Sequence, residues 1–560
     1  MRKQNIFIGV AWPYVNGELH IGHLAGYLIP ADIYARFHRY IGNNVLMVSG
    51  SDCHGTPITV EAEKRHLTPK EVVDLYHPKH KELFDFYNLS FDIYTKTTTV
   101  NHKRVVHEIF IRLAKNGYIY KKRSFQYFSS IENRFLPDRY VEGICPYCKF
   151  PNARGDQCEK CGKILEEGML IKPRSKLTGH PVKLKETEHY YFNLPKLEPF
   201  LKKYVMEKGP SWRDWVYKET LGWLKEGLKP RCITRDINWG VKIPIKFLPP
   251  ELRIKNVKNK RIYVWFEAVI GYLSASIEWA KGSNKWRDFW YSKEGTSHYY
   301  FMGKDNLVFH TLFWPAQLYG AYKDIHLPDY PIINHFLTLE GRPFSKSRNI
   351  FISAKYIGKK YGVDPVRFYL TLIMPETSDS NFSWSDFVET NNNVLIGTFA
   401  NFIHRTLKLA SHIRNFSGKE VENKVAIETE KLLKKSREYL LNCQFKAYAK
   451  TIINIANFGN KYLQQYSPWE FDRNSKEFKR VMTNALLIVL AINLACEPLI
   501  PSTNKKLAKM LGIKIETWPE REIIRYLKSF IPKIKIKNPK PLFNKITPSI
   551  VNIERAKLNI

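Results

Sequence analysis

The chain has 560 residues, 44% of them hydrophobic and 14% aromatic, a composition that excludes a disordered protein and predicts about two to four globular domains. Its 88 Lys and Arg against 53 Asp and Glu give a formal charge of +35, which favours a polyanionic partner such as RNA, although a general bias towards Lys and Ile explains the charge equally well. The longest apolar stretch, residues 485–495, is too short to span a bilayer and predicts a buried helix. Without a secretory signal or a membrane span, we expect a cytoplasmic protein with no membrane contact.

The first predicted elements are a strand over residues 6–10 and a helix that begins near His20. A turn-rich stretch joins them, so the helix N-terminus should face the end of the strand, where it favours anions. His20 and His23 lie one helical turn apart on one face, and Gly22 has no side chain to keep a nucleotide from the backbone. This pattern predicts a phosphate-binding site. Considered alone, however, a histidine pair at helical spacing is more often a surface or core pair.

Four cysteines form two CxxC turns on either side of residues 149–157. This spacing is typical of tetrahedral zinc held by four thiolates, a closed site with a structural role. Disulfides or a redox pair are the alternatives, and the absence of a secretion signal favours zinc. The predicted zinc ligands are Cys145, Cys148, Cys158 and Cys161.

Past the middle of the chain, Lys346 stands between Ser345 and Ser347 on a predicted loop, where it supplies a mobile positive charge. Such a loop alone is a common surface turn. Together with the histidine pair it predicts an ATP site that forms adenylates. From about residue 386 the pattern becomes helical with few glycines, which predicts a helix bundle. The basic tail after Lys533 suits either contact with RNA or an amphipathic edge strand over residues 535–537 that packs back on the body.

With these motifs in hand, the chain resembles methionyl-tRNA synthetases, which are class I aminoacyl-tRNA synthetases, over essentially its whole length. Further matching segments are residues 11–17, 50–58, 135–139, 263–272, 303–306 and 309–315. The resemblance implies an α/β fold, with a doubly wound parallel-sheet (Rossmann-like) catalytic domain split by a zinc-binding insertion and followed by an α-helical bundle. We expect the second half of the parallel sheet to resume near residues 231–236.

The resemblance also implies a division into consecutive regions. They are the first catalytic half with the histidine motif (1–115), an insertion (116–228) with the zinc knuckle at about 140–166, the second catalytic half (229–330), a lysine-loop and stem-contact region (331–385), the anticodon-binding bundle (386–535) and a basic segment that packs back on the body (536–560).

The resemblance assigns roles to residues that match the family motifs. The catalytic residues are His20, His23 and Lys346, and the ATP or adenylate ligands are Gly22, Gly303, Lys304, Asp305, Ser345 and Ser347. The methionine ligands are Ala11, Trp12, Tyr14, Asp52, Trp265, Tyr272 and His310, with Asp52 on the α-ammonium; the anticodon readers are Asn401, Arg405 and Trp469.

Three positions depart from the family pattern: Pro343 stands where the lysine loop usually has its first lysine, Phe344 replaces a methionine, and Trp12 replaces a leucine. Activity should persist because Lys346 is retained. The expected reaction joins methionine to tRNA(Met) through methionyl-adenylate, with Mg²⁺ accompanying ATP and one structural Zn²⁺.

The chain ends without the dimerising domain of some family members, so we expect a monomer, with a separate tRNA-binding subunit as a further partner. The alternatives are a class I synthetase for another apolar amino acid or for cysteine, a small-molecule nucleotidylyltransferase, and a non-catalytic tRNA-binding protein.

Overall fold

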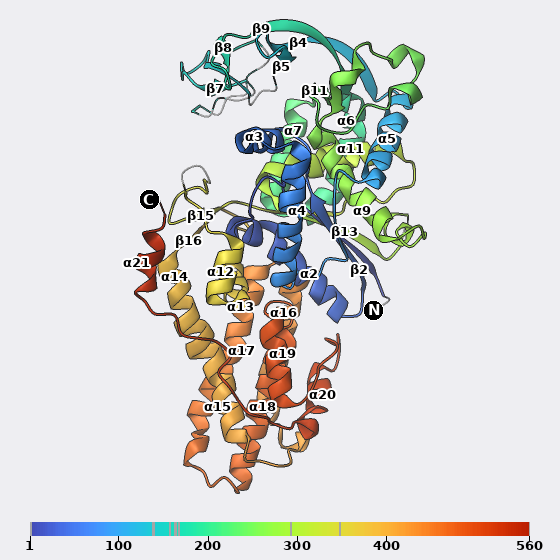
Figure 1. Ribbon diagram of the computed structural model, residues 1–560. Helices are drawn as coiled ribbons and strands as arrows, with labels where there is room; N and C mark the ends of the chain where they lie inside the picture. The colour runs from blue at the N-terminus through green and yellow to red at the C-terminus, as the bar shows by residue number, and fades with distance from the viewer. Residues whose placement is uncertain are drawn as a thin grey trace.

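The computed structural model describes residues 3–136, 140–155, 158, 160–161, 165, 168–291, 294–345 and 349–558. Figure 1 shows three parts from top to bottom: a β-rich insertion, a parallel sheet flanked by helices, and a long helical bundle. The N-terminus lies at the parallel sheet, and the chain returns to this middle part at its C-terminus. The predicted combination of a split parallel-sheet domain and a helical bundle is confirmed.

The central sheet has five strands in the order β14-β13-β1-β2-β3, and every neighbouring pair is parallel. Strands β1 and β2 are buried on both faces because helices cover both sides of the sheet. In β1, for example, Ile6 and Ile8 enter one hydrophobic core while Phe7 enters the other. The strands are β1 (Asn5–Val10), β2 (Asn44–Ser51), β3 (Ile93–Lys96), β13 (Thr296–Gly303) and β14 (Tyr330–Asn334).

Helices around this sheet begin at residues suited to capping. Thr68 accepts a hydrogen bond from the Glu71 amide, and Thr99 accepts one from the His102 amide. Two segments, η1 and η9, are π-helical, a geometry often found at functional sites. The helices are α1 (Ile21–His23), η1 (Leu24–Leu28), α2 (Ile29–Tyr40), α3 (Thr56–Arg65), α4 (Pro69–Phe86), α5 (Val100–Lys115), α8 (Val264–Glu267), α9 (Gly271–Trp279), α10 (Arg287–Trp290), η9 (Phe309–Phe313), α11 (Trp314–Ala321), α12 (Ala354–Tyr361) and α13 (Val363–Leu372).

The insertion is built on a long antiparallel pair, β4 and β9, in a sheet of order β10-β9-β4-β5. A second sheet, β7-β6-β8, lies next to the cysteine cluster, and Cys145 and Cys158 belong to its small hydrophobic core. Helices α6 (Leu194–Lys208) and α7 (Asp214–Glu226) complete the insertion. The strands are β4 (Ile119–Ser129), β5 (Arg134–Phe135), β6 (Val141–Ile144), β7 (Ala153–Arg154), β8 (Ile171–Ser175), β9 (Lys183–Phe192) and β10 (Arg231–Cys232).

The prediction that the parallel sheet resumes near residues 231–236 is wrong. Strand β10 pairs antiparallel with β9 of the insertion, and β11 (Thr234–Asp236) pairs antiparallel with β12 (Lys260–Ile262). Charged residues interrupt this segment, so it forms short strands at an edge rather than a strand buried on both faces. The parallel sheet resumes only at β13, where Tyr300, Phe301 and Met302 form a fully buried run.

The bundle that follows is helical as predicted. Its central helix, α18, has the length and composition of a membrane span, but 89% of its most apolar window is buried inside the protein, which confirms the predicted core helix. The helices are α14 (Trp384–Glu389), η10 (Thr390–Ala400), α15 (Asn401–Ala410), α16 (Asn423–Leu441), α17 (Phe445–Tyr466), α18 (Lys476–Cys496), α19 (Pro501–Leu511) and α20 (Ile523–Lys528).

The basic tail packs back on the body, as expected, but residues 535–537 form no strand. The amides of Lys535 and Lys537 donate to the carbonyls of Leu511 and Met510, at the end of helix α19, so no neighbouring strand pairs with this segment. The last helix, α21 (Ile550–Arg555), then lies against α14.

A buried ion cluster joins the sheet domain to the bundle. Arg367 Nη2 is 2.7 Å from Asp32 Oδ2, and Arg36 bridges Asp32 and Glu497 at 2.9 and 3.2 Å. Arg367 also donates to the carbonyl of Leu499 at 2.8 Å. Burial raises the pKa of Asp32, but the charges of Arg36 and Arg367 and the hydrogen bonds from Ser90 outweigh it and keep this pKa below its ordinary value. The cluster fixes how α2 sits against the bundle.

Candidate active site

A cavity of about 570 Å³ opens at the carboxyl ends of strands β1, β2, β13 and β14, the edge where parallel sheets bind ligands. All the predicted methionine residues line it: Ala11, Trp12, Tyr14, Asp52, Trp265, Tyr272 and His310. The predicted nucleotide residues that line it are His20, Gly22, His23, Gly303 and Asp305. Segments far apart in the sequence therefore meet in one site.

The histidine pair forms the N-terminus of helix α1. His20 is the N-cap; its Nδ1 accepts from the Gly22 amide at 3.1 Å, while His23 Nδ1 accepts from the His20 amide at 3.2 Å. Since Nδ1 is an acceptor in both rings, a neutral ring carries its proton on Nε2. The His20 ring stacks on Phe344, with centroids 4.5 Å apart. This side chain belongs to the segment that leads into the predicted lysine loop.

The two ends of the predicted lysine loop pair with each other. Ser345 and Ile350 exchange backbone hydrogen bonds at 2.8 and 2.9 Å, which joins the two ends of the loop beside the histidine pair. Ser345 lines a smaller hollow with His20, His23 and Phe344. The predicted Lys346 and Ser347 lie outside the described residues.

Lys304 occupies a different place from the other predicted nucleotide residues. Its Nζ is 2.8 Å from Asp379 Oδ1 and 4.4 Å from the centre of the Phe336 ring, and the residue does not contribute to the described lining of the cavity. Its partners Asp379 and Phe336 do line the cavity. Lys304 therefore holds part of the wall in place.

An aromatic slot forms the inner end of the cavity. His310 Nδ1 lies 2.9 Å from the Asn306 carbonyl and so donates to it, which leaves Nε2 to accept from the Tyr272 hydroxyl at 2.8 Å. Burial lowers the pKa of His310 to about 4, so the imidazole is neutral at pH 7. At the mouth, Trp265 is 39% exposed and donates through Nε1 to the Tyr14 hydroxyl at 2.7 Å. The slot combines apolar ring faces with weak polar groups.

Asp52 closes one side of this slot. It follows β2, is only 4% exposed, and its backbone forms a bridge with Tyr14. Burial, together with the nearby negative charge of Glu267, raises the pKa of Asp52 well above its ordinary range. A carboxyl group in this state is stabilised as an anion when a cation enters beside it.

Trp12 fits between two glycines. A Cβ atom added at Gly50 would lie 2.3 Å from the Trp12 ring, and one at Gly271 would lie 2.7 Å from it. The larger residue at this position is thus accommodated by the absence of side chains on β2 and α9. The Trp12 Nε1 is buried and has no hydrogen-bond partner among the described residues.

Several cavity residues were missed from the sequence. Tyr27 lies one helical turn beyond His23, a spacing that could have revealed it. His335 and Phe336 directly follow strand β14, so their place at the sheet edge could have been inferred once that strand was assigned. Asp379 offered no local signal because it joins the wall only through the tertiary fold.

The predicted anticodon residues meet on the bundle. The Arg405 guanidinium lies 4.8 Å from the centre of the Trp469 ring, although the two residues come from α15 and from a turn after α17. Trp469 is 42% exposed, and Asn401, one turn before Arg405, is also exposed. An exposed ring beside a guanidinium suits stacking on an unpaired base.

The four predicted zinc ligands also converge. Their Sγ atoms all lie within 4.8 Å of one another, with Cys145 to Cys161 at 3.9 Å and Cys148 to Cys158 at 3.6 Å. Tetrahedral zinc with Zn–S bonds of about 2.3 Å requires S–S distances of about 3.8 Å. Four converging thiols at these separations suit a zinc ion held by four cysteines.

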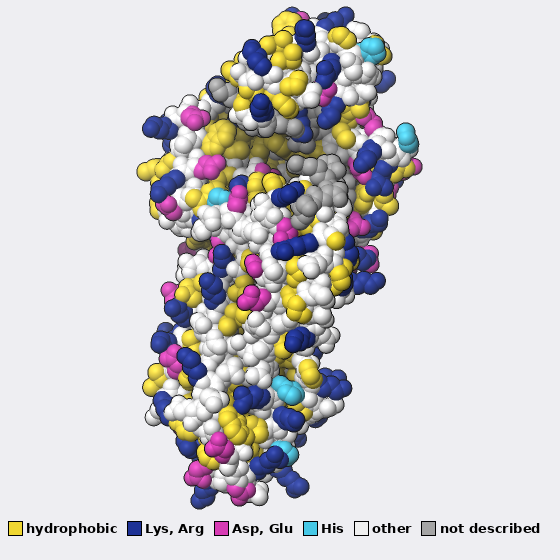
Figure 2. Space-filling view, turned by 90° about the vertical axis from the view of Figure 1, so that its left-hand side faces the viewer, with side chains coloured by type: hydrophobic (Ala, Val, Ile, Leu, Met, Phe, Trp, Pro, Cys, Tyr) yellow, Lys and Arg dark blue, Asp and Glu magenta, His cyan; other side chains and the backbone are white. Residues whose placement is uncertain are grey.

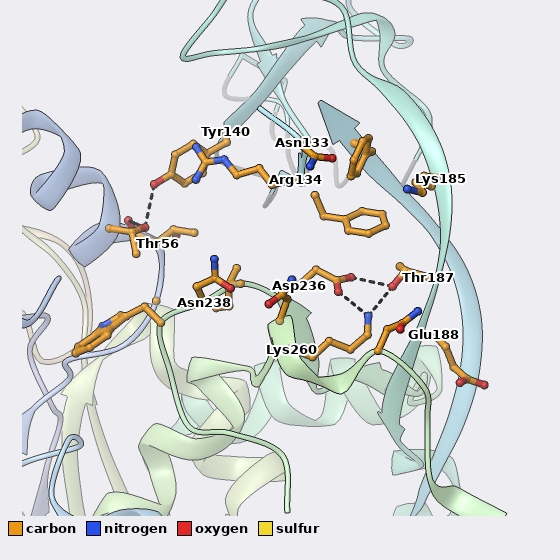
Figure 3. Close-up of a pocket in the computed structure, with 18 of the residues that line it drawn as sticks. Thr56, Asn133, Arg134, Tyr140, Lys185, Thr187, Glu188, Asp236, Asn238 and Lys260 are labelled. Carbon is orange, nitrogen blue, oxygen red and sulfur yellow. Dashed lines mark hydrogen bonds and ion pairs between the residues drawn. The ribbon is translucent and has the colours of Figure 1, made fainter. Parts of the chain in front are cut away.

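A second cavity, of about 820 Å³, lies between the insertion and the loop after β2 (Figure 3). Figure 2 shows this side of the molecule hollowed beneath the insertion, with Lys and Arg side chains distributed over the face. At its floor, Lys260 Nζ lies 2.6 Å from both Asp236 Oδ1 and Thr187 Oγ1. The lining contains more cations than anions: Lys121, Arg123, Arg134, Lys185, Arg253, Lys255 and Lys260 against Glu63, Glu186, Glu188 and Asp236.

This parallel sheet, the capped histidine pair at its edge and the helical bundle define a class I aminoacyl-tRNA synthetase. The family profile described as tRNA synthetases class I (M) matches residues 6–407, and the profile of the anticodon binding domain of methionyl tRNA ligase matches residues 416–557. The chain therefore belongs to the methionyl-tRNA synthetase family.

Known proteins resemble the chain over its whole length. The methionine–tRNA ligase of Dehalococcoides mccartyi (strain CBDB1) is 42% identical over 568 residues and covers 100% of both chains. That of Roseiflexus sp. (strain RS-1) is 40% identical over 594 residues, covering 99% of each. The solved structure of Mycobacterium tuberculosis methionyl-tRNA synthetase with methionyl-adenylate has a TM-score of 0.77 at 22% identity, covering 96% of this chain and 99% of that one, which extends the likeness of fold.

The packing of Trp12 against Gly50 leads to a first prediction. Gly50→Ala should lower the free energy of unfolding by about 1–3 kcal/mol, because the new methyl group overlaps the indole. Denaturant unfolding should show that Trp12→Leu restores most of this loss in the double variant. Gly222→Ala, where a Cβ meets no atom within 4 Å, serves as the control. An equal loss in the presence of Leu at position 12 would contradict the packing argument.

Proposed function

We propose that the chain is a methionine–tRNA ligase, which activates methionine with ATP to methionyl-adenylate and pyrophosphate and then transfers methionine to the 3′-terminal ribose of tRNA(Met). One observation carries the proposal: a single cavity joins an anion-favouring helix N-terminus, with His20 and His23, to an aromatic slot that ends at Asp52. The helix N-terminus suits the phosphates of ATP, and the aromatic slot suits methionine. The domain division expected from the sequence stays a prediction, as does a separate tRNA-binding subunit.

Adenylation requires no protein nucleophile. An oxygen of the methionine carboxylate attacks the α-phosphorus of ATP, and the bond to the pyrophosphate oxygen breaks. The protein then has to align the two anions and stabilise the negative charge that develops on the phosphates. His20 and His23 stand at the helix N-terminus, Gly22 leaves room for the nucleotide, and Lys346 is the expected mobile cation. Mg²⁺ accompanies the ATP phosphates.

Methionine is recognised at the other end of the cavity. Asp52 receives the α-ammonium, while the Trp265 and Tyr272 rings and the neutral His310 surround the thioether. A polarizable sulfur gains from contact with aromatic rings, whereas an alkyl chain of the same length gains less. The Trp12 indole also lines this end of the cavity.

The tRNA contacts both ends of the molecule in this proposal. Asn401, Arg405 and Trp469 receive unpaired anticodon bases on the bundle. The second cavity receives the unpaired acceptor end, since residues of one loop, Asp52 and Thr56, line the catalytic and second cavities respectively. Edge-packed Phe128 and Phe135, with ring centroids 5.2 Å apart, offer stacking surfaces, and the surplus of cations offers phosphate contacts.

The central test is amino-acid-dependent exchange of pyrophosphate into ATP by the purified chain. We expect exchange with methionine and none with isoleucine, valine, leucine or cysteine. Asp52→Asn should raise the KM for methionine far more than that for ATP, and Lys346→Ala should reduce kcat. Exchange with a different amino acid would overturn the methionine assignment, and absence of exchange with any would favour a non-catalytic tRNA-binding protein.

If the second cavity receives the acceptor end of the tRNA, changes there should impair transfer of methionine to tRNA without impairing methionine activation. Replacing Lys185 and Lys255 together by Glu should slow aminoacylation of tRNA by about tenfold or more through lost phosphate contacts, while pyrophosphate exchange stays near the wild-type rate. The charge-matched control replaces two exposed lysines of the bundle side by Glu, Lys434 and Lys514, which pair with Glu430 and Glu516. Equal aminoacylation by the double variant and the control would rule out this route for the acceptor end.

The cysteine cluster predicts one zinc ion per chain, measurable by elemental mass spectrometry. Cys148→Ser should lose the ion and lower the unfolding temperature, because the insertion's small core contains two of the thiolate residues. Cys443→Ser, at a buried thiol far from the cluster in sequence, should keep it. Stoichiometric zinc retained by Cys148→Ser would contradict the four-thiolate site.

A further inference from the structure

A buried acid with two histidine partners lies behind the loop that carries Asp52. Glu267 is 0% exposed; its Oε1 accepts from His54 Nδ1 at 2.7 Å and its Oε2 accepts from His102 Nε2 at 2.5 Å. His102 Nδ1 lies 2.9 Å from Ser274 Oγ. None of these side chains lines the described wall of the catalytic cavity, and the reaction steps above do not use them.

The cluster links three elements to the substrate wall. Helix α8 presents Trp265 to the cavity and Glu267 to the interior, while His102 comes from the first turn of α5. His54 follows Asp52 on the loop, and its amide donates to Asp52 Oδ1 at 3.4 Å. A change at Glu267 therefore reaches Asp52 through one hydrogen-bonded residue.

The charges of the cluster act on Asp52. Burial opposes ionisation of Glu267, but the charges and hydrogen bonds of His54 and His102 outweigh it and bring its pKa to about 2. The resulting anion adds to burial in raising the pKa of Asp52. Among the described residues, no Lys or Arg forms an ion pair with either carboxylate.

The other groups around Asp52 do not neutralise it. Tyr14 faces it through the backbone bridge, and the neighbouring Cys53 thiol stays protonated because burial and the Asp52 charge raise its pKa to about 12. His54, His102 and Glu267 are the titratable side chains that the loop, α5 and α8 contribute to this buried cluster. Before a cation binds, these surroundings favour a proton on Asp52. An entering ammonium group replaces this proton.

We propose that Glu267, His54 and His102 form a positioning cluster that sets the charge of Asp52, so that binding of the amino acid's α-ammonium releases a proton from this carboxyl group. The protonated carboxyl loses its proton to solvent, and the carboxylate pairs with the ammonium, so charge and atoms balance. This inference rests on the proposed placement of the methionine ammonium at Asp52. It assigns Glu267 a role in substrate affinity, while the residue itself touches no substrate.

The sign of the pH effect follows from this coupling. Below the raised pKa of Asp52 the ammonium competes with a bound proton, so the KM for methionine should rise as pH falls, by up to about tenfold per pH unit. Glu267→Gln removes the neighbouring anion and should move this rise to lower pH. His102→Gln removes a partner that stabilises the Glu267 anion and should move the rise in the same direction, by a smaller amount. The KM for ATP should follow neither change.

Calorimetry of methionine binding to the full chain, in buffers of different ionisation enthalpy, counts the protons released, and exchange kinetics from pH 6 to 8.5 give the KM profile. We expect proton release by the wild type, less release by Glu267→Gln, and KM shifts to lower pH in both variants, with the smaller shift in His102→Gln. Asp329→Asn, at a buried carboxylate bonded to His326, is the matched control and should change stability without changing either quantity.

Equal proton release by the wild type and Glu267→Gln would overturn the inference, as would no release by the wild type. If Glu267→Gln does not fold, the His102→Gln variant provides the test. An unchanged pH profile of its KM for methionine would reject the role of the cluster. These results remain separate from the proposed function: methionine-dependent exchange with an unaltered pH profile leaves the ligase assignment intact, whereas absence of exchange removes both.

Discussion

The parallel pairing of β1 with β13 is the constraint on which the catalytic part depends. Its register runs from Asn5 opposite Thr296 to Val10 opposite Phe301, and the insertion lies between the two strands in sequence. One residue further on, the Ala11 amide donates to the Phe301 carbonyl at 2.9 Å. This bond aligns the segment before the histidine pair with the end of β13. Since the closure entropy of a loop grows only with the logarithm of its length, a large insertion can be tolerated there.

Near the carboxyl ends of these strands, some buried polar atoms have no hydrogen-bond partner among the described residues. Trp12 Nε1 and His335 Nε2 are buried beside the cavity without hydrogen-bond partners among the described residues, and Asp52 is a buried carboxyl next to an anionic cluster. Such groups cost stability in a free protein. A ligand or ordered water that pairs with them recovers this cost, so the arrangement favours an occupied site. The buried ion cluster of Asp32 and Arg367 contributes to the rigid frame around it.

Local patterns predicted much of this structure. The histidine motif, the cysteine quartet and the buried helix α18 were found because each depends on short-range spacing or on one apolar run. Residues 231–236 were misassigned because a short strand's sheet depends on its distant partner. Glu267 and His335 could not be found from spacing, since tertiary contacts give them their roles. The residue roles themselves stay predictions, and the geometry supplies the tests.

The central claim is that one cavity holds both the amino acid and the nucleotide. The most direct measurement is an experimental structure of the chain with a non-hydrolysable methionyl-adenylate analogue. We expect the ammonium at Asp52, the thioether between Tyr272 and His310, and the nucleotide along Gly22 and His23. An analogue bound outside this cavity, or bound with its amino-acid end away from Asp52, would show that the cavity does not hold both substrates.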